Sequence, residues 1–493
     1  MSQNIQFQGF EYEWQKGAFL SRSEAEYGLQ ELWRLTAGTS DWDGEPVMRF
    51  EAITREAILR MFALPTGRLP WLAVAGLFDD GGLARALPDR LPAVCQTCPE
   101  HSLRGAEMRF PLDLVAAVFL WLTRWEEAVL GPELDIHGRV LGATCFSQEQ
   151  GFLDRPILDE WASVLRSLLR GRRPGWNIIT SRASIRLSHD VDVIRRYPNL
   201  YRLIRGIIGQ SLRAEWRVAE ASRAAITAVR GYLSLAEDPF FRGLLDLCRL
   251  DAALDPQPVT YLMSSLRSDQ DNGYSLDSRS FTTAVAALRS CRHALGWHPG
   301  YYAATDRDRL RLEKSRLEDA LGEQVVRSRF HLLRWSAKYS WDDLEAVGIR
   351  EDSSVGYADL PGFRCGTCHP FQTFSLTQQC RLELVEVPLI IMDATLRGMR
   401  RLGTYDRQLL GKLSSRVARA GGTLAVLIHN SFGDFGDEKV LCDLIGELLR
   451  FRCDPDCTSP LFDLSLPGAG VIAKCYRQAV AELWHPWEPT GAQ

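Results

Sequence analysis

Short apolar runs alternate with stretches of helical periodicity along the second half of the chain. From residue 258 onward the runs are PVTYLM, ALGWHP, QVVRSRFHLL, LELVEVPLIIMD and GGTLAVLIHNS, and helical spacing of apolar residues follows each of them. Alternation of this kind is typical of βαβ units, in which the strands run parallel. The pattern predicts an α/β fold whose parallel sheet is either open or closed into a barrel.

Two other parts of the chain have a different pattern. Residues 1–170 mix helical stretches with short strands such as WLAVAGLF, and GRRPG at 171–175 interrupts the pattern with glycine and proline. Because 493 residues exceed one ordinary core, we predict a smaller mixed α/β domain at 1–175 and a second domain at 181–480. Residues 197–250 have helical spacing without a strand signal, which predicts a helical insertion or lid in the second domain.

The composition is that of a soluble globular protein, with 24% charged residues and a formal net charge of -4. It gives no sign of a nucleic-acid partner. The first residues, MSQNIQFQGFEYEW, lack the basic and apolar regions of a secretion signal, and no uncharged apolar run is long enough to span a bilayer. We therefore expect a cytoplasmic protein whose twelve cysteines are reduced thiols, and we assign no metal to the pairs CQTC and CGTC.

The run RLSHDVDV, at 186–193, ends an apolar strand with a histidine and two acids. Side chains alternate between the faces of a strand, so Asp190 and Asp192 point to the same side. Two carboxylates in one small volume raise the pKa of one of them unless a cation or an arginine lies between them. The pair therefore indicates either a metal ion or a shared proton.

Five polar residues lie at or just beyond the C-terminal ends of predicted strands. They are Asp192, His298, His331, Asp393 and His429. Active-site loops of α/β proteins lie at these ends, so the five side chains can meet at one rim. Asp192 with His298 and His331 offers one carboxylate and two imidazoles, a set that suits zinc or a similar divalent ion.

The neighbouring residues would supply acid–base chemistry. Asp190 can take a proton from metal-bound water, and His429 can protonate the leaving group while Asp393 orients its imidazole. Arg329 and Arg364 are candidates to pair with Asp190 or to stabilise an oxyanion, although a surface ion pair accounts for each arginine equally well.

The motifs LSHDVD, GWHPGYY, RSRFHLLRW, GFRCGTCHPF and LIHN, in this order and spacing, resemble the polysaccharide deacetylase superfamily, in particular a long subgroup with an added N-terminal domain. LWLTRWEEAV, DIHGRV and GFLDRPILDEW extend the resemblance more weakly into the first domain. It implies a distorted (β/α) barrel with an Asp-His-His metal site that removes acetyl groups from N-acetylated sugars. Asp190 falls at the position of the general base, Asp192 and His298 at metal ligands, and His429 at the general acid.

The second histidine of the metal site departs from the commoner pattern of this superfamily. That pattern has it one helical turn after the first, where this sequence has Tyr302, so either His331 replaces it or the site binds metal weakly. Aromatic residues also crowd the loops of the motifs, and sugar rings pack on aromatic faces. They are Trp297, Tyr301, Tyr302, Trp335, Tyr339, Trp341 and Phe363.

We therefore predict a metal-dependent hydrolase, with zinc as the ion, that removes an N-acetyl group from an amino sugar of a glycan or glycan precursor. A cytoplasmic location would favour the precursor of a surface glycan. One alternative is a glycosyltransferase that holds a divalent ion through its Asp-x-Asp pair, which leaves His298, His331 and His429 without a role. A second alternative is a catalytically inactive glycan-binding protein on a deacetylase barrel, which the Tyr302 departure makes credible.

Overall fold

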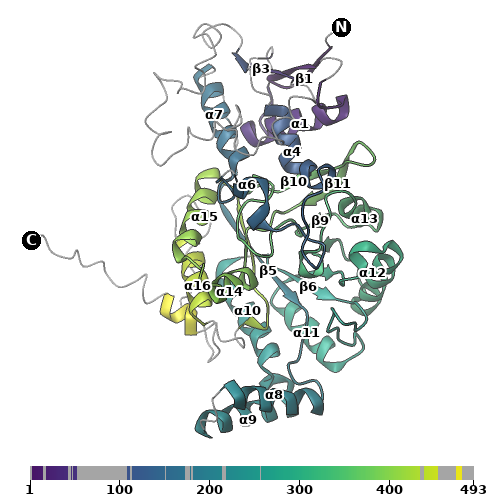
Figure 1. Ribbon diagram of the computed structural model, residues 1–493, viewed down its shortest axis with the longest axis vertical. Coiled ribbons are helices and arrows are strands. Elements are labelled where there is room, and N and C mark those ends of the chain that lie inside the picture. The colour runs from purple at the N-terminus through teal and green to yellow at the C-terminus, as the bar shows by residue number, and fades with distance from the viewer. Residues whose placement is uncertain are drawn as a thin grey trace, which may run out of the picture.

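The computed structural model describes residues 3–14, 18–42, 46, 48–52, 108–110, 114–149, 151–172, 178, 181–213, 218–255, 257–432, 438–452 and 474–479. These residues form a small sheet and a large sheet, which follow one another along the long axis of the molecule (Figure 1). The predicted strand WLAVAGLF and the pair CQTC lie outside the described residues.

The large sheet has nine strands, and every neighbouring pair is parallel except β10 with β11. In sheet order the strands are β10 (Phe371–Ser375), β11 (Cys380–Glu386), β9 (Glu351–Asp352), β8 (Arg327–Ser328), β7 (Ala294–His298), β6 (Val259–Met263), β5 (Ser184–Val191), β13 (Thr423–Leu427) and β12 (Ile391–Met392). The prediction of an α/β fold with a parallel sheet is confirmed. Within the described ranges β10 and β12 are edge strands that do not pair with each other, so the expected closure into a barrel is not seen.

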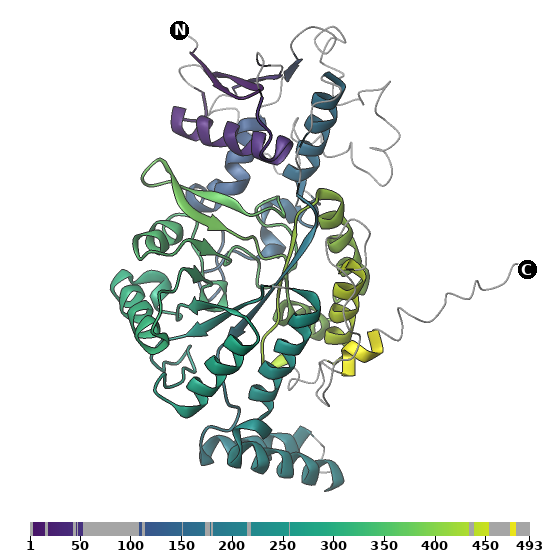
Figure 2. The same cartoon turned by 180° about the vertical axis from the view of Figure 1, so that it is seen from behind.

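Helices that lie between strands along the chain, together with α16 after the last strand, cover the large sheet (Figures 1 and 2). They are α10 (Pro239–Leu254), α11 (Arg279–Ser290), α12 (Arg307–Leu321), α13 (Ser340–Ala346), α14 (Asp393–Arg401), α15 (Arg407–Ala420) and α16 (Glu438–Arg452). The buried residues of α11 are Phe281, Ala284, Val285 and Leu288, the spacing of a single apolar helix face. All five residues of β6 are buried, as expected for a central parallel strand with both faces covered.

The small sheet has the order β1-β2-β3-β4, with β1 (Gln3–Phe7), β2 (Phe10–Trp14), β3 (Met48–Glu51) and β4 (Met108–Phe110). Its helices are α1 (Arg22–Ala37), α4 (Leu114–Thr123), α5 (Trp125–Val129), α6 (Phe146–Glu149) and α7 (Ile157–Arg172). The ring centroid of Tyr27 on α1 lies 5.1 Å from that of Phe374 on β10, and its hydroxyl donates a hydrogen bond to the Gln372 carbonyl. One continuous apolar core therefore joins the two sheets.

The predicted insertion is helical. It consists of α8 (Leu200–Arg213), α9 (Val218–Leu233) and α10, and the pair α8–α9 projects from the end of the molecule opposite the small sheet (Figures 1 and 2). Tyr197, Leu203 and Ala228 form a small apolar cluster between these two helices and the chain before them. On α8, Ile204 and Ile208 are about half exposed, whereas the apolar face of α10 is buried against the large sheet.

The cysteines and the membrane-spanning potential of the helices test two further expectations from the sequence. Cys442 and Cys475 form a disulfide, so the expectation of reduced thiols is wrong for this pair. Cys442 is on α16 and Cys475 lies in a short helical segment at 474–479, and no local pattern in the sequence indicates that these two segments meet. Among the described residues, every helix is too short or too polar to cross a membrane.

Candidate metal centre and acid–base groups

The end of β5 carries the two acids of the HDVD motif. Asp190 lies within the strand and is buried, and Asp192 follows the last residue of the strand. Arg329, just beyond β8, donates hydrogen bonds from Nη1 to Asp190 Oδ1 at 3.1 Å and to Ser188 Oγ at 2.9 Å. Its other nitrogens bond to the carbonyl and hydroxyl of Ser353, so the guanidinium is fixed. The positive charge that the sequence predicts beside the two acids is therefore supplied at Asp190 by Arg329.

Asp192 lies against two histidines, one at the end of β7 and one in a short 3-10 helix. Its Oδ1 atom is 3.2 Å from His298 Nε2, at the last residue of β7, and 3.8 Å from His331 Nε2, at the start of η7 (His331–Leu333). Asp192 Oδ1 and His298 Nε2 are buried and make no hydrogen bond with any described residue. Buried polar atoms without partners are costly, and one carboxylate oxygen with two imidazole nitrogens is a donor set that suits a divalent metal ion. The residues present therefore fit the metal that the sequence predicts.

The far nitrogen of each histidine is held by a hydrogen bond. His298 Nδ1 lies 2.6 Å from the carbonyl oxygen of Arg329, and His331 Nδ1 lies 2.8 Å from Asp271 Oδ1. Because a carbonyl or carboxylate oxygen accepts, Nδ1 of each ring carries a proton, and Nε2 is the nitrogen that faces Asp192. Asp271 was missed by the sequence reasoning, since it lies in the loop after β6 and follows no strand end directly.

The charges of this cluster stabilise one another. Burial raises the pKa of Asp192, but His298 and His331 outweigh it, so that the pKa of this carboxyl lies well below its usual range. Burial lowers the pKa of His298, and the carboxylates of Asp190 and Asp192 reverse this effect and raise it. Asp192 is thus held in the ionised form that ligates metal ions.

A second pair of side chains lies at the same edge of the sheet. Asp393, the first residue of α14, is buried, and its Oδ1 atom lies 2.6 Å from His429 Nδ1, while Oδ2 accepts the backbone N–H of His429 at 2.8 Å. Burial lowers the pKa of His429, but Asp393 outweighs it and raises the pKa to about 9, with smaller contributions from Asp192 and Asp190. The next residue, Asn430, donates a hydrogen bond to the Val193 carbonyl at 3.0 Å, which ties the loop after β13 to the loop after β5.

Arg364 lies elsewhere, contrary to the sequence prediction that paired it with Asp190 or an oxyanion. Its Nη2 and Nε atoms donate to the two carboxylate oxygens of Glu127, at 2.5 and 3.1 Å, and Nη1 donates to the Gly356 carbonyl. Arg124 joins the same buried ion-pair cluster. The guanidinium is saturated by a residue of the first part of the chain, which no local pattern around Arg364 indicates.

The aromatic residues of the motifs also divide into two groups. Those with side chains buried in the core are Trp297, Trp335, Trp341 and Phe363. Tyr301 and Tyr302 are half-buried, and Tyr339 is 48% exposed. The Tyr302 hydroxyl donates to Asp269 at 2.7 Å and is not among the candidate ligands that gather around Asp192.

The turn that carries His331 is held by the first part of the chain. Leu332 and Leu333 have φ angles of 58° and 54°, in the left-handed region that side chains other than glycine rarely adopt. Arg139 Nη1 donates to the Leu332 carbonyl at 2.8 Å, and Arg334 Nε donates to the His137 carbonyl at 2.8 Å. Residues of the DIHGRV motif therefore fix the turn, a role the sequence reasoning did not assign to them.

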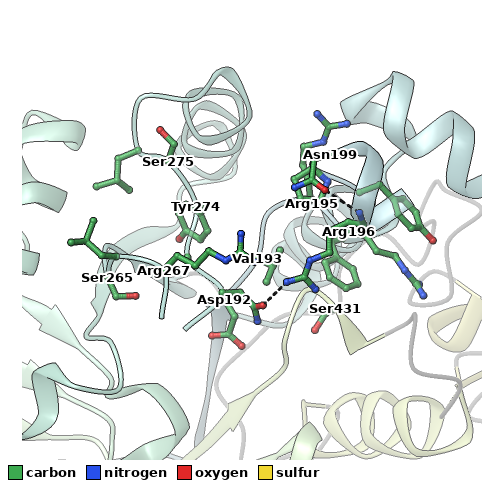
Figure 3. Close-up of a pocket in the computed structure, with 18 of the residues that line it drawn as sticks. Asp192, Val193, Arg195, Arg196, Asn199, Ser265, Arg267, Tyr274, Ser275 and Ser431 are labelled. Atoms are coloured by element: carbon green, nitrogen blue, oxygen red, sulfur yellow. Dashed lines mark hydrogen bonds between the residues drawn. The ribbon is translucent and has the colours of Figure 1, made fainter. Parts of the chain in front are cut away.

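A cavity of about 1220 Å³ opens beside Asp192. Figure 3 shows Asp192 at its base, between Arg195, Arg196 and Asn199 on one side and Ser265, Arg267, Tyr274 and Ser275 on the other. The first wall belongs to the start of the helical insertion and the second to the loop after β6. The candidate metal centre is thus open to a pocket large enough for a substrate.

Comparisons with known proteins give the following matches. Residues 39–174 match a family described as "Family of unknown function (DUF7033)". The search of curated proteins found no match.

Three solved structures align with most of the chain at low identity. A structure named as a polysaccharide deacetylase from Mycobacterium smegmatis is 11% identical, covering 64% of this chain and 95% of that one, with a TM-score of 0.36. Another, from Pseudomonas aeruginosa PAO1, is 12% identical, covering 62% and 93% with a TM-score of 0.34. A structure named Puue Allantoinase is 11% identical, covering 72% and 100% with a TM-score of 0.35.

Proposed function

We propose that the protein is a metal-dependent amide hydrolase that removes the N-acetyl group of an amino sugar. The observation that carries the proposal is the convergence on Asp192 of two histidines whose Nε2 atoms are within 3.8 Å of its Oδ1 atom. The ion would be zinc, which takes mixed imidazole and carboxylate donors in catalytic sites and keeps a position open. Bound there, the ion would polarise the acetyl carbonyl and lower the pKa of water.

Asp190 would act as the general base. Its buried carboxylate accepts a hydrogen bond from Arg329 at 3.1 Å, which holds it in place at the end of the sheet. Its Oδ2 atom is 3.8 Å from His298 Nε2, so it faces the same small volume as the candidate ligands. In the reaction the water oxygen bonds to the acetyl carbon while the water proton passes to Asp190.

His429 would act as the general acid. As the bond between the acetyl carbon and the sugar nitrogen breaks, the nitrogen needs a proton to leave as an amine, and His429 Nε2 would give it. Asp393 holds the imidazole through Nδ1 and through the backbone, so Nε2 is directed away from that carboxylate. The products are acetate and the free amino sugar, and the proton taken up by Asp190 replaces the one that His429 donates.

The sugar would pack on the aromatic residues that are accessible. Tyr301 and Tyr302 follow His298 in the loop after β7, with ring centroids 5.1 Å apart, and are half-buried. Aromatic faces of this kind suit the apolar face of a sugar ring.

We further propose that residues 1–175 and 181–480 act as two domains. We also propose that the protein works in the cytoplasm on a glycan precursor.

The test is acetate release from a panel of N-acetylhexosamine glycosides by the zinc-loaded protein. Activity should disappear after chelation and return when zinc is added. If metal is bound stoichiometrically but no N-acetylated sugar releases acetate, the proposal is wrong. Transfer of sugar from a nucleotide sugar, with release of the nucleotide and no acetate, would establish the glycosyltransferase alternative instead.

A further inference from the structure

We propose that the amino-sugar substrate carries a phosphate or diphosphate ester, which binds in the arginine-lined pocket beside Asp192. This inference rests on the proposed function, because it names the class of sugar that the same site would accept. Nucleoside diphosphate sugars and lipid diphosphate sugars both carry this diphosphate ester.

The charge of the pocket is strongly asymmetric. Six arginines line it, namely Arg195, Arg196, Arg202, Arg205, Arg267 and Arg316. The acids that line it are Asp192, Asp277 and Asp319, and the first of these is a proposed metal ligand. With a divalent ion bound, the pocket would be more positive still. A whole chain with a formal net charge of -4 thus has a local concentration of positive charge at its candidate active site.

Part of this positive charge is fixed by hydrogen bonds to the protein. Arg202 Nη2 donates across the pocket to Asn272 Oδ1 at 3.1 Å, and Arg316 Nη1 donates to the Ser264 carbonyl at 2.8 Å. Arg195 donates to the carbonyl oxygens of Gly231 and Tyr232. The contact of Arg202 joins the two walls, and none of these contacts is to a carboxylate, so they do not neutralise the charge of the three guanidinium groups.

Two arginines are available to a ligand. In the part of the chain that the structure describes, no hydrogen bond or ion pair involves the guanidinium of Arg205 or of Arg267, and both residues are exposed. Arg205 is on α8 and Arg267 is on the loop after β6, so they belong to opposite walls. Arg267 and Asp192 both line this pocket (Figure 3). An anion between the two walls would be contacted from both sides.

Phosphate is the group that this arrangement fits. A guanidinium presents planar pairs of N–H donors that match the oxygens of phosphate, and such charge-assisted bonds are stronger than neutral ones. A neutral glycan offers only hydroxyls and amides, which carry no charge. Its binding would therefore not account for several arginines gathered in one pocket. The cavity of about 1220 Å³ also exceeds the roughly 300–1,000 Å³ of typical small-ligand pockets, which leaves room for a diphosphate beyond the sugar.

The test compares three ligands that share the acetylated sugar. They are uridine diphosphate N-acetylglucosamine, a short-chain polyprenyl diphosphate N-acetylglucosamine and the neutral disaccharide diacetylchitobiose. Binding is measured by calorimetry on the zinc-loaded Asp190→Asn variant, so that no turnover occurs. We expect at least one diphosphate sugar to bind tenfold or more tightly than the disaccharide, with an affinity that falls as salt rises. Which of the two binds better identifies the carrier.

The arginines are tested in the same assay. The double variant Arg205→Gln/Arg267→Gln should reduce the preference for the diphosphate sugar over the disaccharide by about tenfold or more, because each substitution removes a charge-assisted contact. The matched control is Arg419→Gln, since Arg419 is an exposed arginine of α15 that does not line the pocket. The control should keep the preference of the parent protein.

The outcomes separate this inference from the proposed function. Acetate release is measured separately, on the zinc-loaded protein with Asp190 intact. If that protein releases acetate from the disaccharide and neither diphosphate sugar binds more tightly than the disaccharide, the inference fails while the hydrolase proposal stands. If the diphosphate sugar binds through the two arginines but no ligand releases acetate, the inference about the ligand stands and the hydrolase proposal fails. An equal loss of affinity for all three ligands in the double variant would also overturn the inference.

Discussion

The Nη1 atom of Arg139 donates a hydrogen bond to the carbonyl oxygen of Leu332 at 2.8 Å. Leu332 directly follows His331 and has a left-handed backbone conformation, which costs about 1 kcal/mol or more and persists only when surrounding contacts hold it. Arg139 is itself fixed by Asp135, whose carboxylate accepts a hydrogen bond from Arg139 Nε at 2.9 Å. The first part of the chain therefore sets the position of a candidate metal ligand in the second.

We predict that Arg139→Gln weakens metal binding. Loss of the contact to Leu332 frees the turn, so His331 Nε2 would no longer be held toward Asp192, and contacts behind a ligand are typically worth about tenfold or more in metal affinity. The measurement is competitive titration of zinc against a chelator. Arg166→Gln is the control, because Arg166 likewise donates to backbone carbonyls, those of Leu35 and Thr36, away from the site. Equal zinc affinities of the parent and Arg139→Gln proteins would show that the turn keeps its conformation without the contact from Arg139.

The two acids of the HDVD motif should give different phenotypes. Asp192→Ala removes a charged ligand, and the purified protein should lose its stoichiometric metal without unfolding. Asp190→Asn keeps the shape and the metal but removes the proton acceptor, so turnover should collapse even with metal in excess. Elemental analysis and acetate release distinguish the two. Unchanged metal content in Asp192→Ala, or wild-type turnover in Asp190→Asn, would contradict the respective role.

Replacement of His429 should slow the reaction without removing the metal. His429→Ala is expected to lower kcat by about a hundredfold, the usual contribution of general acid catalysis. Asp393→Asn should lower it less, since the imidazole remains but loses its charged partner. A substrate with a good leaving group needs little protonation, so the effect of His429→Ala should shrink there. The same loss with good and poor leaving groups would indicate a structural role for His429.

The stability of the protein should fall in acid through His293. Burial lowers the pKa of His293 to about 4, although Asp251 opposes this effect; Asp251 and His189 are the charged groups that face the ring. An unfolded histidine has a pKa of about 6.5, so the neutral ring contributes stability that is fully present above pH 6.5 and is lost as the pH falls toward about 4.

His293→Asn should make this acid-side loss of stability shallower. Asparagine can keep a hydrogen bond to Thr260, which now bonds to His293 Nδ1 at 2.9 Å. Urea unfolding at pH 7 and pH 4.5 gives the difference in stability for each protein, with His137→Asn as the control at a partly exposed histidine. The assignment fails if the parent and His293→Asn proteins lose the same stability between these two pH values.

The helical pair α8–α9 should exchange its amide hydrogens faster than the large sheet does. Ile204 and Ile208 of α8 are 50% and 53% exposed, whereas every residue of β6 is buried, and segments with few buried apolar contacts open at lower free energy. Hydrogen exchange followed by mass spectrometry of peptides from both regions measures the difference. Protection of α8–α9 equal to that of β6 would argue for a fixed structural role of the insertion.

Local sequence patterns determined the class of fold and the edge at which the candidate site lies. The alternation of apolar runs with helical spacing predicted a parallel sheet, because the two periodicities depend only on backbone geometry within each element. The two-residue period of a strand also predicted that Asp190 and Asp192 share one volume, and both carboxylates do lie near His298 Nε2. Since parallel strands end at the same edge, the strand-end positions of His298 and His429 brought them into one region.

Only the tertiary structure decided which residues meet within that region. His331, and not Tyr302, lies near Asp192 because a left-handed turn held by Arg139 directs it there. Arg329, and not Arg364, pairs with Asp190, since Glu127 from the other part of the chain takes the guanidinium of Arg364. These contacts join residues far apart in the sequence, and their energies depend on how separate elements pack. A pattern confined to one strand or one helix contains no information about the neighbour that will lie against it.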